Sequence, residues 1–337
     1  MKIIVPMAGM GKRMRPHTLT IPKPLIPVAG KPIVQKIIED LEEVCGEGIE
    51  EVAYIIHPSF GKSVEQSLIS VAEKLGAKGS IYYQHEALGT AHAIMCAKES
   101  LDGNVLVVFA DTLFKAGFKL DRNKDGIIWV QQIEDPRQFG VVKLDGNGII
   151  TDFVEKPQTF VSDLAIIGIY YFKDGANLRK ELQYLLDHKI MEKGEYQLTN
   201  ALENMKQKGL KFEPGKVQEW LDCGNKNSTV YTNGRILHHM HNDGAKMVDD
   251  SAEINQSTVI QPSFIGKNVK LTRSVVGPYV SIGDGCVIEN SVIGNCIVQN
   301  NSSIMNAVIN NAMIGNHVEY HGESKDLSIG DYTTVMP

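Results

Sequence analysis

Several features typical of other protein classes are absent from this sequence of 337 residues. No run approaches the roughly 18 consecutive apolar residues of a membrane-spanning helix. The 34 Lys and Arg form no block and are outnumbered by 40 Asp and Glu, which gives a net charge of −6. General nucleic-acid binding needs a basic face, so we expect neither a membrane nor a nucleic acid as a partner.

The cysteines and histidines also lack any motif spacing. The five cysteines contain no Cys-x-x-Cys pair, which argues against a disulfide framework or a zinc site and predicts a cytoplasmic location. The ten histidines have no metal-ligand spacing, and His238, His239 and His241 are expected at a solvated helix end. The apolar run in residues 1–8 is short for a signal peptide, so we expect it to be a first strand.

The length predicts two domains, at about 150 residues per domain. A hydrophobic fraction of 43% is ordinary for a folded chain with a sizeable core, and the pattern changes near residue 250. We therefore expect a first domain over 1–240, a linker over 241–256, a repeat domain over 257–322, and a C-terminal cap or tail over 323–337.

Before residue 250, apolar runs alternate with amphipathic helical patterns. Strands are predicted over residues 2–8, 51–56, 80–84 and 104–110, and helices over 33–44, 63–75, 90–98, 178–186, 198–208 and 226–239. Such alternation is typical of a mostly parallel sheet covered by helices. Consecutive strands from 126 to 172, with a turn at 145–148, predict an antiparallel extension. The fold class is therefore α/β with a mixed sheet.

The last quarter of the chain repeats itself in four rows, 257–273, 274–290, 291–306 and 307–322. In register, one apolar column contains Ile265, Ile282, Val298 and Ile314, and a second contains Leu271, Ile288, Ile304 and Tyr320. No row can bury its apolar face alone, so the rows must stack as the coils of a solenoid. Gly and Asn recur at the corners, where tight bends need positive φ. An ordinary sandwich of short strands would not give fixed columns.

The strongest chemical signal is the loop at residues 8–14, AGMGKRM, which follows the first predicted strand. Its glycines allow backbone N–H groups to approach phosphate closely. A dinucleotide-binding fingerprint would need a third glycine at Met14, and a P-loop would need wider glycine spacing and a hydroxyl where Arg13 stands. Cations and prolines crowd residues 12–24, and prolines on both sides hold Lys23 in a fixed place.

Residues 8–32, AGMGKRMRPHTLTIPKPLIPVAGKP, closely resemble the signature of the sugar-1-phosphate nucleotidylyltransferases, or NDP-sugar pyrophosphorylases. The resemblance continues in order with Gln84, Leu88-Gly89-Thr90-Ala91, Ala110-Asp111, Phe139-Gly140-Val141-Val142, Glu155-Lys156-Pro157, Gly168-Ile169-Tyr170, residues 195–199, and Trp220-Leu221-Asp222-Cys223-Gly224. It covers residues 1 to about 240. The family's usual Gly-Gly-x-Gly-Thr-Arg becomes Gly9-Met10-Gly11-Lys12-Arg13, in which a cation replaces a hydroxyl.

The coils also resemble those of longer family members, above all the long glucose-1-phosphate thymidylyltransferases and uridylyltransferases. The resemblance implies a Rossmann-like mixed-sheet nucleotidyltransferase domain followed by a short hexapeptide-repeat left-handed β-helix. The handedness is implied by the resemblance and not by the period.

The implied reaction joins an NTP, most closely dTTP or UTP, to a sugar 1-phosphate, most closely glucose 1-phosphate, and releases pyrophosphate. A phosphate monoester has a second pKa of about 6, so at pH 7 it is already a dianionic nucleophile and no general base is required. The enzyme must instead bring two anions together and stabilise the departing pyrophosphate. That chemistry needs cations, N–H donors and Mg²⁺, the implied cofactor.

The resemblance assigns catalytic roles to Arg13 and Lys23. Nucleotide contacts are expected from Ala8, Gly9, Gly11, Lys12, Gln84, Gly89 and Thr90. Contacts to the sugar phosphate are expected from Gly140, Glu155, Lys156, Tyr170, Glu195 and Thr199, although Tyr170 fits core packing equally well.

The resemblance also assigns Asp111 and Asp222 to the metal, although Asp222 alone would be an ordinary turn residue. Asp111 and Gln84 have a further reason in their own chemistry. Asp111 ends an apolar strand, where open α/β sheets bind ligands, although a turn or helix cap would also explain it. Asp111 and Asp222 supply the hard oxygen ligands that Mg²⁺ prefers. The amide of Gln84 can donate and accept at once, which matches the N3–H and carbonyl of uracil or thymine.

Three hypotheses for the function remain at this point. The first is the nucleotidylyltransferase, as a homo-oligomer assembled through the coils. The second adds an acyltransferase in the coils, with His317 and His321 available as bases. The third is a non-catalytic regulatory subunit that binds sugar nucleotide, which the presence of Arg13, Lys23 and both aspartates disfavours.

Overall fold

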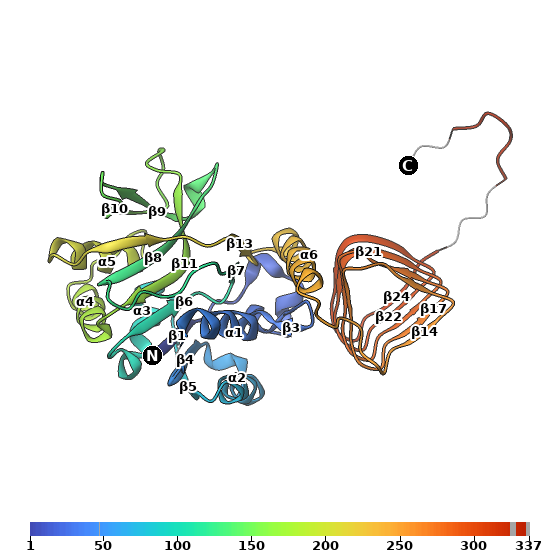
Figure 1. Ribbon diagram of the computed structural model, residues 1–337, viewed down its shortest axis with the longest axis horizontal. Coiled ribbons are helices and arrows are strands. Elements are labelled where there is room, and N and C mark those ends of the chain that lie inside the picture. Colours follow the sequence, from blue (N-terminus) through green and yellow to red (C-terminus); the bar gives the residue numbers. More distant parts are fainter. Residues whose placement is uncertain (47, 324–327, 335–337) are drawn as a thin grey trace. The chain divides into compact units, whose positions relative to one another are not determined.

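The computed structural model describes residues 1–46, 48–323 and 328–334. By their contacts, these residues form two compact units (Figure 1). The first contains residues 1–26 and 31–225, and the second contains residues 27–30 and the chain from 226 onward. None of the helices in these described ranges is both long and apolar enough to cross a bilayer.

The first unit is built on a nine-stranded mixed sheet. Along its main path the order is β10 (Ile150–Glu155), β9 (Gly140–Leu144), β11 (Leu164–Phe172), β6 (Val105–Val108), β1 (Lys2–Pro6), β4 (Glu51–Ile56) and β5 (Lys78–Tyr83). β1 is parallel to β4 and β6, and β4 to β5, whereas β11 runs antiparallel to β6. β8 (Gly126–Gln132) and β12 (Phe212–Gly215) extend the sheet beside β11. The predicted mixed α/β sheet is confirmed.

Helices cover the sheet because its central strands are apolar on both faces. α3 (Thr90–Cys96), α4 (Gly175–Asp187) and α5 (Leu198–Gln207) pack on the face that carries Ile4 and Ile55, through buried residues such as Ile94 and Leu182. Each such leucine contributes roughly 2 kcal/mol by its burial. α2 (Lys62–Lys74) packs on β4 and β5, and α1 (Ile33–Cys45) packs on β7 (Thr112–Lys115).

Two strands end earlier than the sequence predicts. β1 ends at Pro6, and the N–H of Met7 makes a last ladder bond to Ile55 O before the chain leaves the sheet. β6 ends at Val108, and the N–H of Phe109 makes a last bond to Gly168 O, where β11 is irregular and Gly168 has φ +86°. Residues 7–11 and 109–111 are therefore loops at one edge of the sheet.

The second unit is a stack of parallel coils. One sheet contains β14 (Glu253–Asn255), β17 (Lys270–Thr272), β20 (Val287–Glu289), β22 (Ser303–Met305) and β24 (Glu319–His321). The other contains β15 (Thr258–Val259), β16 (Ser263–Ile265), β18 (Val275–Val276), β19 (Val280–Ile282), β21 (Val292–Val298) and β23 (Val308–Ile314). The first coil thus begins inside the segment expected to be a linker.

Both predicted columns of the solenoid are confirmed by strand pairing. Ile265 pairs with Ile282, which pairs with Val298, which pairs with Ile314. The second column pairs in the same way, from Leu271 through Ile288 and Ile304 to Tyr320. In each column, the residues of the first three coils are buried. Corner asparagines have left-handed φ, at Asn268, Asn290, Asn301 and Asn306.

The helix α6 (Lys226–Asn242) groups with the coils and packs on β19, β21 and β23. Its fully buried Asn233 accepts hydrogen bonds through Oδ1 from Ala29 N (2.9 Å) and Ser281 Oγ (2.7 Å). Gly30 has φ +82°, and a Cβ there would lie 2.3 Å from the ring of Phe264. The contacts therefore place the boundary between the two units at residue 225. The boundary at residue 240, which was expected for the first domain, stays a prediction.

The end of the chain was expected to be a cap or tail. Residues 328–334 are exposed, and the role of a cap or tail stays a prediction. Positions 324–327 and 335–337 lie outside the described residues.

Candidate active site

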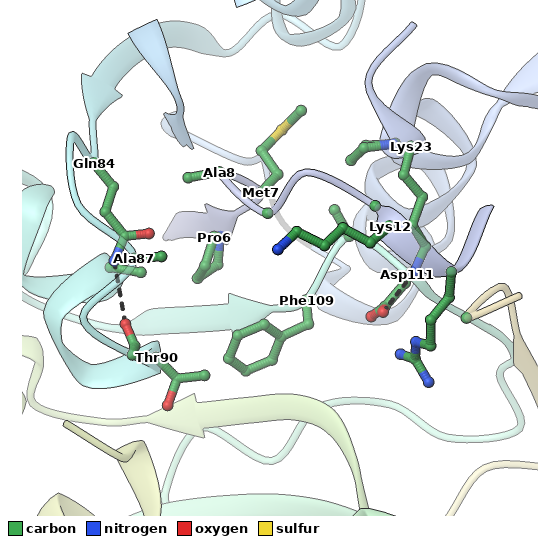
Figure 2. A pocket seen from close by; sticks show the side chains of 18 of the residues that line it. Pro6, Met7, Ala8, Lys12, Lys23, Gln84, Ala87, Thr90, Phe109 and Asp111 are labelled. Carbon is green, nitrogen blue, oxygen red and sulfur yellow. Dashed lines mark hydrogen bonds and ion pairs between the residues drawn. The ribbon is translucent and has the colours of Figure 1, made fainter. Parts of the chain in front are cut away.

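A cavity of ≈ 420 Å³ opens at the carboxyl ends of β1, β5 and β6 (Figure 2). Ligands of open α/β sheets bind at this edge. The cavity lies wholly within the first unit. Its lining brings together most of the candidates chosen from the sequence: Ala8, Gly9, Gly11, Lys12, Arg13, Lys23, Gln84, Gly89, Thr90, Asp111 and Glu195.

The loop that leaves β1 forms one wall of the cavity. Backbone N–H groups from Ala8 to Gly11 make no hydrogen bond within the described part of the chain. Gly11 has φ +57°, and its carbonyl accepts from Thr18 Oγ1 at 2.8 Å. A Cβ on Gly11 would lie 2.9 Å from Thr18, so glycine is required there. The loop thus presents a row of N–H donors suited to a phosphate.

Cations surround this loop. Lys12 and Arg13 lie on a short 3₁₀ turn, Lys12–Met14, that the fully buried Met14 anchors, and both are exposed. Lys23 is buried, and it lies between Pro22 and Pro24 as predicted. Its Nζ atom lies 2.7 Å from Asp111 Oδ2. The cavity therefore combines two cations at the surface with one that is held in place.

The two aspartates predicted as metal ligands end up on neighbouring backbone. β13 (Glu219–Asp222) pairs antiparallel with β7, so that Asp222 lies opposite Thr112, and Cys223 N–H donates to Asp111 O at 2.9 Å. Asp222 Oδ1 accepts from Gly224 N–H at 2.9 Å, and Gly224 lines the cavity. No cluster of three or more His, Cys, Asp or Glu suited to a metal occurs among the described residues. Two carboxylates fit an ion that takes its other ligands from substrate phosphates and water.

Gln84 and Gly89 lie at another end of the cavity. Gln84 is buried, and its Nε2 lies 3.2 Å from Gly89 O and 3.0 Å from His92 Nδ1. Gly89 has φ +108°, and a Cβ there would lie 2.5 Å from Tyr196 O. Thr90 Oγ1 accepts from Leu198 N–H at 2.9 Å. These contacts fix the start of α3 and with it the position of the Gln84 amide.

The remaining sugar-phosphate candidates gather around Glu155 and do not line the cavity. Thr199 Oγ1 donates to Glu155 Oε2 at 3.3 Å, and Lys156 Nζ lies 3.3 Å from Glu155 Oε1. Gly140 lies opposite Glu155 in the β9–β10 pairing. Among the predicted sugar contacts, Glu195 alone belongs to the cavity lining.

Tyr170 is a buried core residue next to this cluster. Burial, reinforced by the carboxylate of Glu155, raises the pKa of its phenol, so the group stays neutral. Its ring meets Phe109 edge to face, with centroids 6.0 Å apart, and Phe109 lines the cavity. Tyr170 therefore supports the wall through Phe109, which agrees with the core-packing alternative.

Sequence analysis missed two residues of this site. Phe109 falls inside a predicted strand, although its place between a buried apolar run and Asp111 could have suggested a wall residue. His92 has no distinctive signal, because one His on an amphipathic helix forms no pattern. Its contact with Gln84 depends on the turn at residues 85–89.

The chain is similar to nucleotidyltransferases over most of its length. The family model described as nucleotidyl transferase matches residues 2–238. The chain is 28% identical to glucose-1-phosphate thymidylyltransferase of Streptomyces griseus, over 100% of this chain and 99% of that protein. It is 30% identical to the bifunctional protein GlmU of Methanocaldococcus jannaschii, over 96% of this chain and 77% of that protein.

A solved structure of UDP-glucose pyrophosphorylase in complex with UDP-glucose has the same fold. Its TM-score is 0.59 at 23% identity, and the match covers 71% of this chain and 98% of that one. The family model matches well over half of the chain, on the strands and loops that form the cavity. This chain is therefore an enzyme of the nucleotidyl transferase family.

Proposed function

We propose that the protein transfers a nucleotidyl group from dTTP or UTP to glucose 1-phosphate and releases pyrophosphate. The observation that carries the proposal is the cavity itself. Free N–H groups and the cations Lys12, Arg13 and Lys23 lie on one side of it, and Gln84 lies at the other end. The name of the relative from Streptomyces griseus supports the choice of sugar and base. A protein that only binds sugar nucleotide would have no need for this set of cations and carboxylates.

The chemistry requires positioning and charge neutralisation. The sugar phosphate is a dianion at pH 7, so it attacks the α-phosphate in line without a general base. Arg13 stabilises the charge that develops on the α-phosphate and pyrophosphate, and the N–H groups of residues 8–11 hold the triphosphate. Fixed donors aimed at such charge are worth about 10²–10³ in rate each.

We infer that Asp111 and Asp222 hold Mg²⁺ together with the triphosphate. The ion, when bound, neutralises phosphate charge and makes the pyrophosphate a better leaving group. Lys23 is then available to the phosphates, since its partner carboxylate binds the metal. Asp111 is 37% exposed at its side chain, which leaves it accessible to an ion.

The sugar is proposed to bind between Glu195 and the cluster around Glu155. The carboxylates accept hydrogen bonds from sugar hydroxyls, the hydroxyl of Thr199 can both donate and accept, and Lys156 pairs with the sugar phosphate. The cluster does not line the cavity, so we expect residues near Lys156 to approach when the sugar binds.

We propose that the protein is a cytoplasmic homo-oligomer joined through its coils. Its five cysteines are free thiols, as suits a reducing compartment. Val292 and Val308 pair on neighbouring coils and are exposed at 47% and 86%. A Val308→Lys variant should have a lower mass by light scattering if this column joins two copies, and an unchanged oligomer would rule the column out.

A second candidate activity resides in the coils. The similarity to a protein named bifunctional extends over 96% of this chain. His317 lies exposed at a corner with φ +55°, and His321 is exposed on β24. Turnover of acetyl-CoA by the intact protein, lost in His317→Ala, would establish this activity.

The main proposal is tested by a matrix of nucleoside triphosphates against sugar 1-phosphates, scored by Mg²⁺-dependent pyrophosphate release. The highest kcat/KM is expected for dTTP or UTP with glucose 1-phosphate. A clear preference for GTP or ATP would defeat the base assignment and leave the reaction class standing. No release from any pair would defeat the reaction.

A further inference from the structure

We propose that His92 is a specificity-determining positioning residue, which fixes the amide of Gln84 so that its oxygen faces the nucleobase. The inference rests on the proposed function, because it takes the nucleobase to lie at the Gln84 end of the cavity. It adds a residue that does not itself line the cavity.

The orientation of the Gln84 amide follows from its two partners. Nε2 lies 3.2 Å from Gly89 O and 3.0 Å from His92 Nδ1. A backbone carbonyl can only accept, so the NH₂ end of the amide must face Gly89. One of its protons remains, and it is donated to His92 Nδ1. That nitrogen must then be the unprotonated one of the ring.

The opposite end of the amide is presented to the cavity. Figure 2 shows the oxygen of Gln84 turned toward the space beside Ala8 and Pro6, with Nε2 turned away from it. No hydrogen bond to Oε1 is present among the residues that the structure describes. The cavity therefore meets a lone acceptor whose orientation is already set, and the expectation that Gln84 would donate to the base as well as accept from it is not met.

The state of His92 agrees with this arrangement. The ring is half-buried near the start of α3, and desolvation lowers its pKa, with the carboxylate of Glu86 opposing the shift. A neutral imidazole has one acceptor nitrogen, which here faces Gln84. Rotation of the amide by 180° would set Oε1 against Gly89 O, and His92 could bond to the rotated amide only as its other tautomer, with the proton on Nδ1. The Nε2–H tautomer of His92 therefore adds to the orientation that Gly89 sets.

A fixed acceptor distinguishes between pyrimidines of the same size. Uracil and thymine carry a proton on N3 and can donate to Oε1, whereas N3 of cytosine is an acceptor and would face the oxygen lone pair to lone pair. Sites built to hydrogen-bond one group reject analogues that lack it. An amide free to rotate would instead donate to cytosine N3, and discrimination would be lost.

The test compares kcat/KM for UTP and CTP, with glucose 1-phosphate and Mg²⁺, in the full-length protein. His92→Leu removes the acceptor, and we expect the UTP/CTP ratio to fall about 10-fold or more. His92→Asn places Oδ1 near the position of Nδ1, so it should keep the ratio within about threefold. His92→Gln extends its polar atoms toward the position of ring Nε2, so it should behave like His92→Leu and provides a second disrupting variant.

The outcomes separate this inference from the proposed function. If His92→Leu and His92→Gln lower kcat/KM for both nucleotides equally, His92 is a packing residue and the inference is wrong. The same holds if His92→Asn loses discrimination as fully as His92→Leu. If the unaltered protein releases pyrophosphate with UTP and CTP alike, the base is not read by Gln84 and the inference fails while the reaction stands. Absence of pyrophosphate release by the unaltered protein with dTTP as well as UTP overturns the proposed function itself.

Discussion

The ammonium of Lys23 lies 2.7 Å from the carboxylate of Asp111, a partner 88 positions away in the chain. The sequence analysis assigned Lys23 a catalytic role toward phosphate and Asp111 a role as a metal ligand. The ion pair couples those roles, because a cation that binds Asp111 competes with Lys23 for the same oxygen. If Asp111 held a metal ion, the Lys23 ammonium would be released to pair with the phosphates.

Asp111→Asn should impair turnover far more than folding. The amide oxygen still accepts from Lys23, so we expect a change of a few degrees at most in Tm. Loss of a charged metal ligand should lower kcat about 100-fold or more. Steady-state pyrophosphate release over a Mg²⁺ titration and a thermal melt measure both effects. Asp135→Asn, at an exposed carboxylate outside the cavity, is the control, and near-normal rates of Asp111→Asn at saturating Mg²⁺ would contradict the metal assignment.

Arg13→Met should lower kcat/KM about 10²–10³-fold with little change in Tm. The side chain is exposed in the cavity wall, so its removal costs no buried contact. Arg15→Met is the matched control, since Arg15 is an exposed cation in the same loop and does not line the cavity. Equal losses in the two variants would mean that the loop attracts anions in general and that Arg13 has no role of its own.

Much of the fold could be predicted because it follows local periodicity. The columns that begin at Ile265 and Leu271 repeat along the sequence with nearly constant spacing, so the register of the coils follows from the sequence alone. The loop at residues 8–14 and the prolines around Lys23 are likewise local patterns. The candidates within the cavity could be found for this reason.

The rest depends on contacts that no local pattern encodes. Asn233 joins Ala29 and Ser281 across more than 200 and nearly 50 positions, so the grouping of α6 with the coils could not be inferred. The Lys23–Asp111 pair is of the same kind. The hydrogen bond between Gln84 and His92 spans only eight positions, but it requires the left-handed backbone of Gly89, which the sequence shows only as one more glycine.

Asp40 should make stability pH-dependent in a defined direction. Burial raises its pKa to about 7, an effect that Lys36 on the same helix partly offsets. Between about pH 4 and 7 the folded carboxyl therefore holds a proton that the unfolded one has lost, so stability falls as pH rises, by at most about 1.4 kcal/mol per pH unit. Asp40→Asn cannot titrate, and its free energy of unfolding should lose that slope in denaturant titrations. Parallel pH profiles for the two proteins would show that Asp40 titrates normally.

Asn233→Ala should destabilise the second unit. The variant leaves Ala29 N–H and Ser281 Oγ without the acceptor that each now uses, and an unsatisfied buried polar group costs about 1–3 kcal/mol. We expect the free energy of unfolding of the transition that includes the coils to fall by about 2–4 kcal/mol. Asn242→Ala, at an exposed position near the end of the same helix, should change it by less than about 0.5 kcal/mol.

Because residues 27–30 follow closely on Lys23 in the chain, kcat should be measured as well. A stability loss confined to the coils, with kcat unchanged, would mean that α6 and residues 27–30 serve the coils alone. A loss in kcat with Asn233→Ala but not with Asn242→Ala would mean that the coils help to hold Lys23 in the cavity.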